Sequence, residues 1–213
     1  MMKLSPLILP FAVGVLLLLV SEFGRAEEQR PYKLSESREP CADYDPMRRP
    51  FFGDTHVHTS YSFDSYISQQ RNDPWDAYRY AKGEAITLPD GNGNYVVKAQ
   101  ISRPIDFTVI TDHAEYFGEM NVCTNADDMT LGYFWPMCLL MRSEQYLIQM
   151  VGAGEWVDLG VTGVPLKRSW MCSLPGVDCD MKAAGLWDKV QQAAEDHYDR
   201  SSECTFSSFV GYE

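Results

Sequence analysis

The run IDFTVIT at residues 105–111 constrains the fold of this chain more than any other segment. Most of its residues are apolar or β-branched, a composition typical of a strand that is buried on both faces, as in a parallel sheet. Expected strands and helices alternate along the rest of the chain. That alternation predicts a parallel α/β architecture.

Capping and turn residues delimit the neighbouring elements. Asp73 and Pro74 form the pattern of an N-cap followed by proline at the first helical position, so we expect a helix that runs to Gly83. The segment PDGNGN predicts the turn of a hairpin between residues 85–88 and 95–99. The other expected elements are a strand at 51–56, a helix at 186–198 and a strand at 205–212.

Residues 114–185 have no clear period, and they contain four of the six cysteines. A helix within 135–150 is the one element expected there. Cys123 with Cys138, and Cys172 with Cys179, are the pairs that would close short loops. Six cysteines allow fifteen pairings, so the sequence leaves the choice open. None of the six forms a C-x-x-C pair, which argues against a structural zinc site made of thiolates.

The N-terminal segment has the pattern of an export signal. The apolar run Leu7–Val20 is shorter than the roughly 20 residues that a bilayer core requires, and small residues precede a cleavage point after Ala26. An uncleaved membrane anchor is the alternative. We therefore expect a signal peptide at 1–26, an extended lead-in at 27–50 that Cys41 pins, and a secreted or periplasmic domain at 51–213. In such a compartment an even number of cysteines suggests disulfides.

The charge of the chain limits its partners. A net charge of −12 argues against nucleic acid and against anionic membranes as general partners. It leaves room for an anionic small molecule, because bound metal ions reverse the local potential inside a site.

Two histidines stand at the end of the first expected strand. His56 and His58 are separated by one residue, so on a strand both side chains point to the same face. From the C-terminal end of a strand, both imidazoles can reach one metal ion. The plainer interpretation is a surface or pH-responsive pair. Asp54 either orients one of these histidines or simply lies at the strand end.

Residues of the ligand type also follow the other two expected strands. Asp112 and His113 come directly after the buried run, and Glu213 follows the third strand. The carboxyl ends of parallel strands are where α/β folds assemble their sites, so we expect these side chains to face one crevice. Asp64, in the loop after the two histidines, is a further candidate. The plainer interpretations are a helix-capping Asp112, a turn Asp64 and a terminal glutamate without a role. His197 is expected on a solvated surface.

Together these residues resemble the PHP superfamily (polymerase and histidinol phosphatase), and within it the exported branch described as DUF3604. The resemblance rests on FFGDTHVHTSYSFDSY at 51–66, IDFTVITDHAEYFG at 105–118 and FVGYE at 209–213. It implies that this α/β chain is the first part of a distorted (β/α)7 barrel. The histidine motifs that come later in that family are not found, so the chain is interpreted as an N-terminal fragment that is inactive or weakly active by itself.

The resemblance also implies a chemistry. Two or three divalent ions (Zn, Mn or Fe) would activate a water for hydrolysis of a small, phosphorylated ester. His56 and His58 would hold one ion, Asp64 and His113 another, and Glu213 would bridge them. Asp112 would act catalytically, in proton transfer, or would orient a ligand.

Two other functions remain open at this point. An amidohydrolase-type barrel also begins with H-x-H after its first strand and would hydrolyse amides, lactones or phosphotriesters. The Asp-His pair after the second strand and the carboxylate in the loop favour the phosphoesterase. The non-enzymatic alternative is a secreted metal-binding protein.

Overall fold

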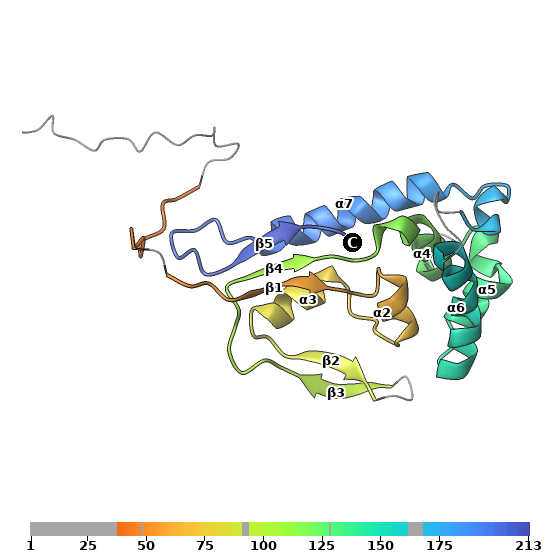
Figure 1. Cartoon of the computed structure of the whole chain (residues 1–213), viewed down its shortest axis with the longest axis horizontal. Helices are drawn as coiled ribbons and strands as arrows, with labels where there is room; N and C mark the ends of the chain where they lie inside the picture. The colour runs from red at the N-terminus through yellow and green to blue at the C-terminus, as the bar shows by residue number, and fades with distance from the viewer. Residues whose placement is uncertain (1–37, 48, 91–93, 128, 162–167) are drawn as a thin grey trace, which may run out of the picture. The chain divides into compact units, whose positions relative to one another are not determined.

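In the computed structural model, the described residues are 38–47, 49–90, 94–127, 129–161 and 168–213, with the side chains of 155–161 left aside (Figure 1). Residues 38–213 form one compact unit. The predicted signal peptide at 1–26 and the first part of the lead-in lie outside the described residues. Within the described part of the chain, no helix combines the length and the apolar character needed to span a membrane.

Three parallel strands form the central sheet. They are β1 (Gly53–Val57), β4 (Phe107–Ile110) and β5 (Ser207–Val210), in the spatial order β1-β4-β5. The strand expected at 105–111 is the central one, and both of its pairings are parallel. The prediction of a parallel α/β architecture is therefore confirmed. The described residues form an open sheet and no closed barrel.

Two helices cover one face of this sheet. They are α3 (Pro74–Ala81) and α7 (Cys179–His197). Tyr78 of α3, Ile110 of β4 and Ala193 of α7 are fully buried in one shared core. The start of α3 agrees with the prediction. The Asp73 side chain accepts a hydrogen bond from the backbone N–H of Asp76, and the Asp76 side chain accepts one from the backbone N–H of Asp73.

The second face of the sheet is less covered than its sequence predicts. Thr108 and Ile110 of β4 are buried, whereas Phe107 and Val109 on the opposite face are only partly buried. Beside them Phe209 of β5 keeps half of its surface exposed. The expectation of burial on both faces is therefore wrong for these residues, because in the described structure only one face receives a layer of helices.

The segment without a clear sequence pattern folds into helices, gathered at one end of the sheet (Figure 1). They are α4 (Phe117–Thr124), α5 (Pro136–Met141) and α6 (Tyr146–Val161). A short 3-10 turn at Leu131–Phe134 lies between α4 and α5, and another at Trp170–Ser173 follows α6. We call residues 114–178, where described, the helical region. Its core is rich in sulfur: Met120, Met141, Met171, Cys123 and Cys138 are almost fully buried.

All six cysteines form disulfides. The pairs are Cys123–Cys138, Cys172–Cys179 and Cys41–Cys204, so the two short-loop pairings expected from spacing are confirmed. The third pair confirms that Cys41 pins the lead-in. Three disulfides indicate an oxidising, extracellular-type compartment.

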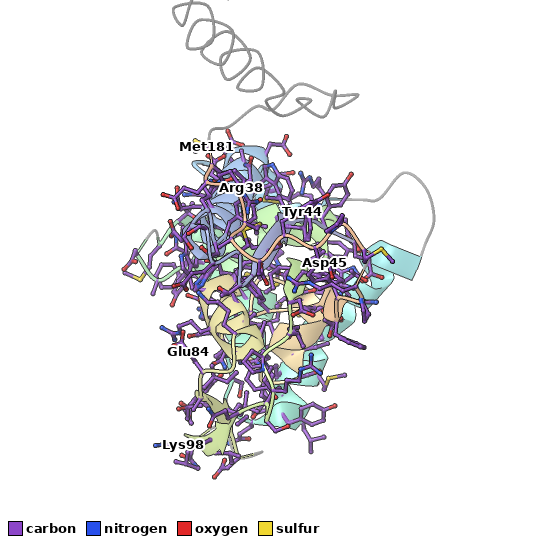
Figure 2. The ribbon with its side chains drawn as sticks, turned by 90° about the vertical axis from the view of Figure 1, so that its left-hand side faces the viewer. Arg38, Tyr44, Asp45, Glu84, Lys98 and Met181 are labelled. Atoms are coloured by element: carbon purple, nitrogen blue, oxygen red, sulfur yellow. A yellow bond between two sulfur atoms is a disulfide. The ribbon has the colours of Figure 1, made fainter. Side chains whose placement is uncertain are left out.

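The lead-in is held by more than its disulfide. The Arg38 guanidinium donates to the Tyr198 hydroxyl at 2.5 Å and contacts the Cys204 sulfur, and the Ala42 amide donates to the Ser202 carbonyl. Figure 2 shows Arg38 far from Lys98, which lies on a separate two-stranded hairpin. This hairpin, β2 (Ile86–Pro89) with β3 (Tyr95–Ala99), is antiparallel as predicted.

Three local features depart from the sequence expectations. A five-residue helix, α2 (Phe63–Ile67), replaces part of the expected loop. Helix α7 begins at Cys179 rather than at Leu186. His197, expected on a solvated surface, is half-buried and stacks on Tyr78 with ring centroids 5.4 Å apart, because the end of α7 packs against α3.

Candidate metal centre

The candidate centre lies where the three parallel strands end. His56 lies in β1 and His58 directly follows it, while the segment after β4 carries His113 and the segment after β5 carries Glu213. Parallel pairing places these carboxyl ends at one edge of the sheet, as the sequence predicted. Asp64 joins them from α2.

His58 is the central member of the cluster. Its Nδ1 lies 2.9 Å from Asp64 Oδ2, and its Nε2 lies 2.8 Å from Glu213 Oε2. The side chain is only 14% exposed, compared with 41% for Asp64 and 47% for Glu213. Both ring nitrogens of His58 therefore face a carboxylate.

His56 and His113 flank this centre. His56 Nε2 lies 3.0 Å from Glu213 Oε2, and His113 Nε2 lies 3.7 Å from Asp64 Oδ2. The rings of both histidines lie about 5 Å from the His58 ring between centroids. The His56 side chain is 69% exposed, so this side of the cluster is open to solvent.

The structure adds a residue that the sequence pattern did not reveal. Glu115, two positions after His113, places its Oε1 3.0 Å from His113 Nδ1. It fixes the ring through the nitrogen that faces away from Asp64, the arrangement by which carboxylates orient metal-binding histidines. Its position soon after the Asp-His pair is the one sequence signal that points to it.

Helix α2 positions Asp64 through its first turn. Asp64 Oδ1 accepts from the Ser62 hydroxyl and from the Ser65 amide, both at 2.6 Å. The hydroxyl of the buried Ser62 also accepts from the His113 amide at 3.2 Å. Ser62 therefore connects the carboxylate of α2 with the strand end that carries His113, and Oδ2 of Asp64 remains directed at the imidazoles.

Asp112 is buried beside the cluster rather than within its groups of candidate ligands. Its Oδ1 accepts from the Thr59 amide at 2.5 Å and its Oδ2 accepts from the Thr59 hydroxyl at 2.7 Å. Burial raises the pKa of Asp112 to about 6, although both bonds from Thr59 act to lower it. The geometry gives this carboxylate a clear positional role, because it joins the end of β1 to the end of β4.

Two glycines permit the close approach of the strands. A Cβ on Gly53 of β1 would lie 2.4 Å from the Phe107 carbonyl oxygen, and a Cβ on Gly211 would lie 2.4 Å from Val109 Cγ1. Neither position has room for a larger residue without a shift of its neighbour. Gly211 thus lets the chain after β5 pass close to β4 and bring Glu213 to the cluster.

Asp54, proposed to orient a histidine ring, instead accepts a hydrogen bond from the His56 backbone amide.

The charges within the cluster reinforce one another. Burial acts to lower the pKa of His58, but hydrogen bonds to Asp64 and Glu213 outweigh it and the pKa is raised. The pKa of Asp64 is lowered, since bonds from Ser62 and His58 outweigh its burial, and the bond from His58 also lowers the pKa of Glu213. At neutral pH both carboxylates are therefore ionised and can serve as ligands.

The donor set fits a divalent ion of borderline softness. Two overlapping groups have their ligand atoms within 4.8 Å of one another: His56, His58 and Glu213, and His58, Asp64 and His113. Imidazole with carboxylate suits zinc, manganese or iron, and an exposed side leaves a place for water. Another group, Glu119 with Cys172 and Cys179, is excluded as a metal site because its two cysteines form a disulfide with each other.

Comparison with known proteins gives one result. The model of a family described as "Protein of unknown function (DUF3604)" matches residues 45–213. Neither a curated protein nor a solved structure matches the chain. The matched segment contains every member of the cluster.

Proposed function

The chain belongs to the DUF3604 family, whose model spans most of its length, and on that premise we propose that it is an exported, metal-dependent hydrolase that cleaves phosphate esters. We propose in addition that its open sheet corresponds to part of a PHP-type barrel. The substrate is a small molecule rather than nucleic acid, because the chain carries a net charge of −12.

One observation carries this proposal. Five side chains from four segments of the chain, three imidazoles and two carboxylates, converge at the carboxyl edge of a parallel sheet. An ion-pair network that only stabilises the fold has no need for three histidines around shared carboxylate oxygens. Divalent ions held there would supply an activated water and would neutralise the charge on a phosphoryl group.

The residues of the chain have separable roles in this mechanism. His56, His58 and Glu213 form the more exposed group of ligands, and Asp64 with His113 forms the more enclosed one around the shared His58. Glu115 holds the His113 ring in place. Asp112 positions the β1 end through Thr59 and is not in contact with the open side of the cluster, which favours a positioning role over direct proton transfer.

The experiment compares metal content and hydrolysis in matched variants. His58→Ala removes the residue shared by both groups, and His197→Gln changes the one histidine outside the cluster. After equilibration with Mn²⁺ or Zn²⁺ and removal of free ion, we expect bound metal in the unchanged chain and in His197→Gln, and a loss of at least about tenfold in affinity for His58→Ala.

Hydrolysis of 4-nitrophenyl phosphate and of bis(4-nitrophenyl) phosphate is then measured in the same three proteins. Activity, expected to be weak in this chain, should follow the metal content and should disappear with a chelator. Equal metal content in His58→Ala and His197→Gln would contradict the metal site. Bound metal without hydrolysis of either ester would contradict the phosphoesterase and leave a metal-binding protein.

A further inference from the structure

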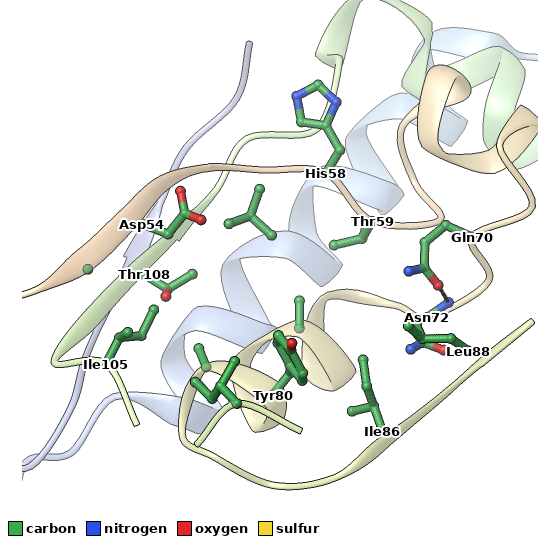
Figure 3. A pocket seen from close by; sticks show the side chains of 15 residues that line it. Asp54, His58, Thr59, Gln70, Asn72, Tyr80, Ile86, Leu88, Ile105 and Thr108 are labelled. Carbon is green, nitrogen blue, oxygen red and sulfur yellow. Dashed lines mark hydrogen bonds between the residues drawn. The ribbon is translucent and has the colours of Figure 1, made fainter. Parts of the chain in front are cut away.

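A cavity of about 450 Å³ lies against β1, separate from the cluster of metal-binding candidates (Figure 3). Its walls come from β1, from α3 and from the β2–β3 hairpin with the segment that follows it. The volume falls in the range of about 300–1,000 Å³ that small-molecule sites occupy.

Most of the cavity wall is apolar. Ile86 and Leu88 of the hairpin line it together with Ala77 and Ala81 of α3, and Figure 3 shows Ile105 at one side. Water in such a space gains few hydrogen bonds, so an apolar molecule would displace it favourably.

Two polar atoms in this wall have no partner. Asn72 Nδ2 and Thr108 Oγ1 are buried and form no hydrogen bond with the described residues, and both side chains line the cavity. Asn72 is 9% exposed and Thr108 is 1% exposed. Buried polar groups are nearly always paired, because an unpaired one costs free energy. The amide nitrogen of Asn72 can only donate, so its missing partner is a hydrogen-bond acceptor.

The cavity is distinct from the metal candidates, although His58 borders both. Figure 3 shows the His58 ring pointing away from the cavity, and its two nitrogens are engaged by Asp64 and Glu213. Strand β1 thus separates the two sites. A molecule in the cavity does not need to contact the ions.

The charge of the lining selects against anions. Apart from His58, the one acidic or basic side chain among the lining residues is Asp54. Its negative charge repels an anion, and a neutral ligand does not meet this penalty.

We propose that this cavity is a binding site for a small, neutral, mostly apolar molecule that carries a hydroxyl or carbonyl group. The apolar body lies between the hairpin and α3, and the polar group pairs with the Thr108 hydroxyl. The site takes its ligand whether or not the cluster holds metal.

The test uses 2-naphthol as the probe, with naphthalene and 2-naphthoate as comparisons. Binding is measured by calorimetry in the presence of a chelator, so that it is independent of the metal site. We expect saturable binding of 2-naphthol at one site, weaker binding of naphthalene, and the weakest binding of 2-naphthoate.

Two neighbouring substitutions locate the probe. Leu88→Trp fills the cavity and should abolish binding, whereas Thr87→Trp on the exposed side of the same strand should leave binding unchanged. Thr108→Val removes the unpaired hydroxyl at constant shape, so it is expected to fold even if Leu88→Trp does not. It should weaken the binding of 2-naphthol about five- to tenfold and leave the binding of naphthalene unchanged.

Three results overturn the proposal. One is the absence of saturable 2-naphthol binding. Another is equal binding by folded Leu88→Trp and Thr87→Trp. The third is an equal effect of Thr108→Val on 2-naphthol and naphthalene, which would show that the hydroxyl does not contact the probe.

Discussion

The strand ends and the helical region are ordered by different means. At the strand ends, hydrogen bonds join Thr59 to Asp112 and join His58 to Asp64 and Glu213, and none of these residues is a cysteine. In the helical region two disulfides lie in or beside a methionine-rich core. Methionine fills irregular space but specifies geometry poorly. Covalent bonds therefore supply order where side-chain packing is adaptable, and buried polar bonds supply it where chemistry needs fixed positions.

The largest effect should come from removing the Cys123–Cys138 disulfide. The double substitution to serine frees a loop with a sequence separation of 15, which corresponds to a loss of about 3 kcal/mol of stability. Hydrogen exchange should show lost protection in α4 to α6, while β4 keeps its protection. Equal loss in both regions would show that the helical region and the sheet unfold as one unit. It would contradict the claim that different interactions order the two regions.

Asp112→Ala should have the next largest effect. It leaves the amide and hydroxyl of the buried Thr59 without an acceptor, at a cost of about 2 kcal/mol. Asp112→Asn is the matched control, since an amide can keep both partners. Urea unfolding measures the difference, and metal affinity should fall along with stability only in the alanine variant. If both variants unfold at the same urea concentration, the bonds to Thr59 are not what joins the strand ends.

Mild acid should affect the end of α7 and helix α4 in opposite directions. Burial, followed by the charge of Lys82, lowers the pKa of His197, so the unfolded state binds more protons and the end of α7 loses stability as the pH falls through about 6.5. Burial raises the pKa of Glu119 in α4, so its folded state binds more protons and acid favours it. Hydrogen exchange at pH 7 and pH 5.5 should show weaker protection of α7 and none lost in α4.

His197→Phe is the control for the first of these effects. Phenylalanine keeps a ring against Tyr78 but does not titrate. The α7 protection of this variant should not change over the same pH interval. A persistent change would assign the acid response to another group.

The smallest effect is expected for exposed apolar residues of α6. Leu147 is 79% exposed, so Leu147→Glu should change the free energy of unfolding by no more than about 0.5 kcal/mol. Thermal unfolding measures this. A larger loss would mean that the helical region relies on α6 packing rather than on its disulfides.

The parts of the fold that follow local rules were predictable from sequence. The cap at Asp73, the antiparallel pairing of the hairpin strands and the β-branched run of β4 each depend on residues close in sequence. The candidate cluster was predictable because parallel strands bring their carboxyl ends together. The order of strands and ligand-type residues in the sequence is therefore enough to predict that these residues lie at the carboxyl edge of the sheet.

The helical region could not be predicted in the same way. The apolar residues of α6 are distributed around the helix rather than along one stripe, so no helical period is visible. Helix α2 is short, and its Ser62 cap forms no side-chain cap bond, which left Asp64 in an expected loop. The surroundings of His197 depend on its stacking against Tyr78, a tertiary contact that no local pattern encodes.

The Cys41–Cys204 disulfide has consequences for folding during synthesis and for the effect of proteolysis. Its cysteines are separated by 163 positions, so Cys41 cannot form this pair until the intervening residues have been synthesised. Until Cys204 arrives, this thiol can attack the disulfides of the helical region. Once the pair has closed, a protease cut anywhere between the two residues leaves both pieces tethered. A nicked molecule would migrate as a single species until a reductant separates it.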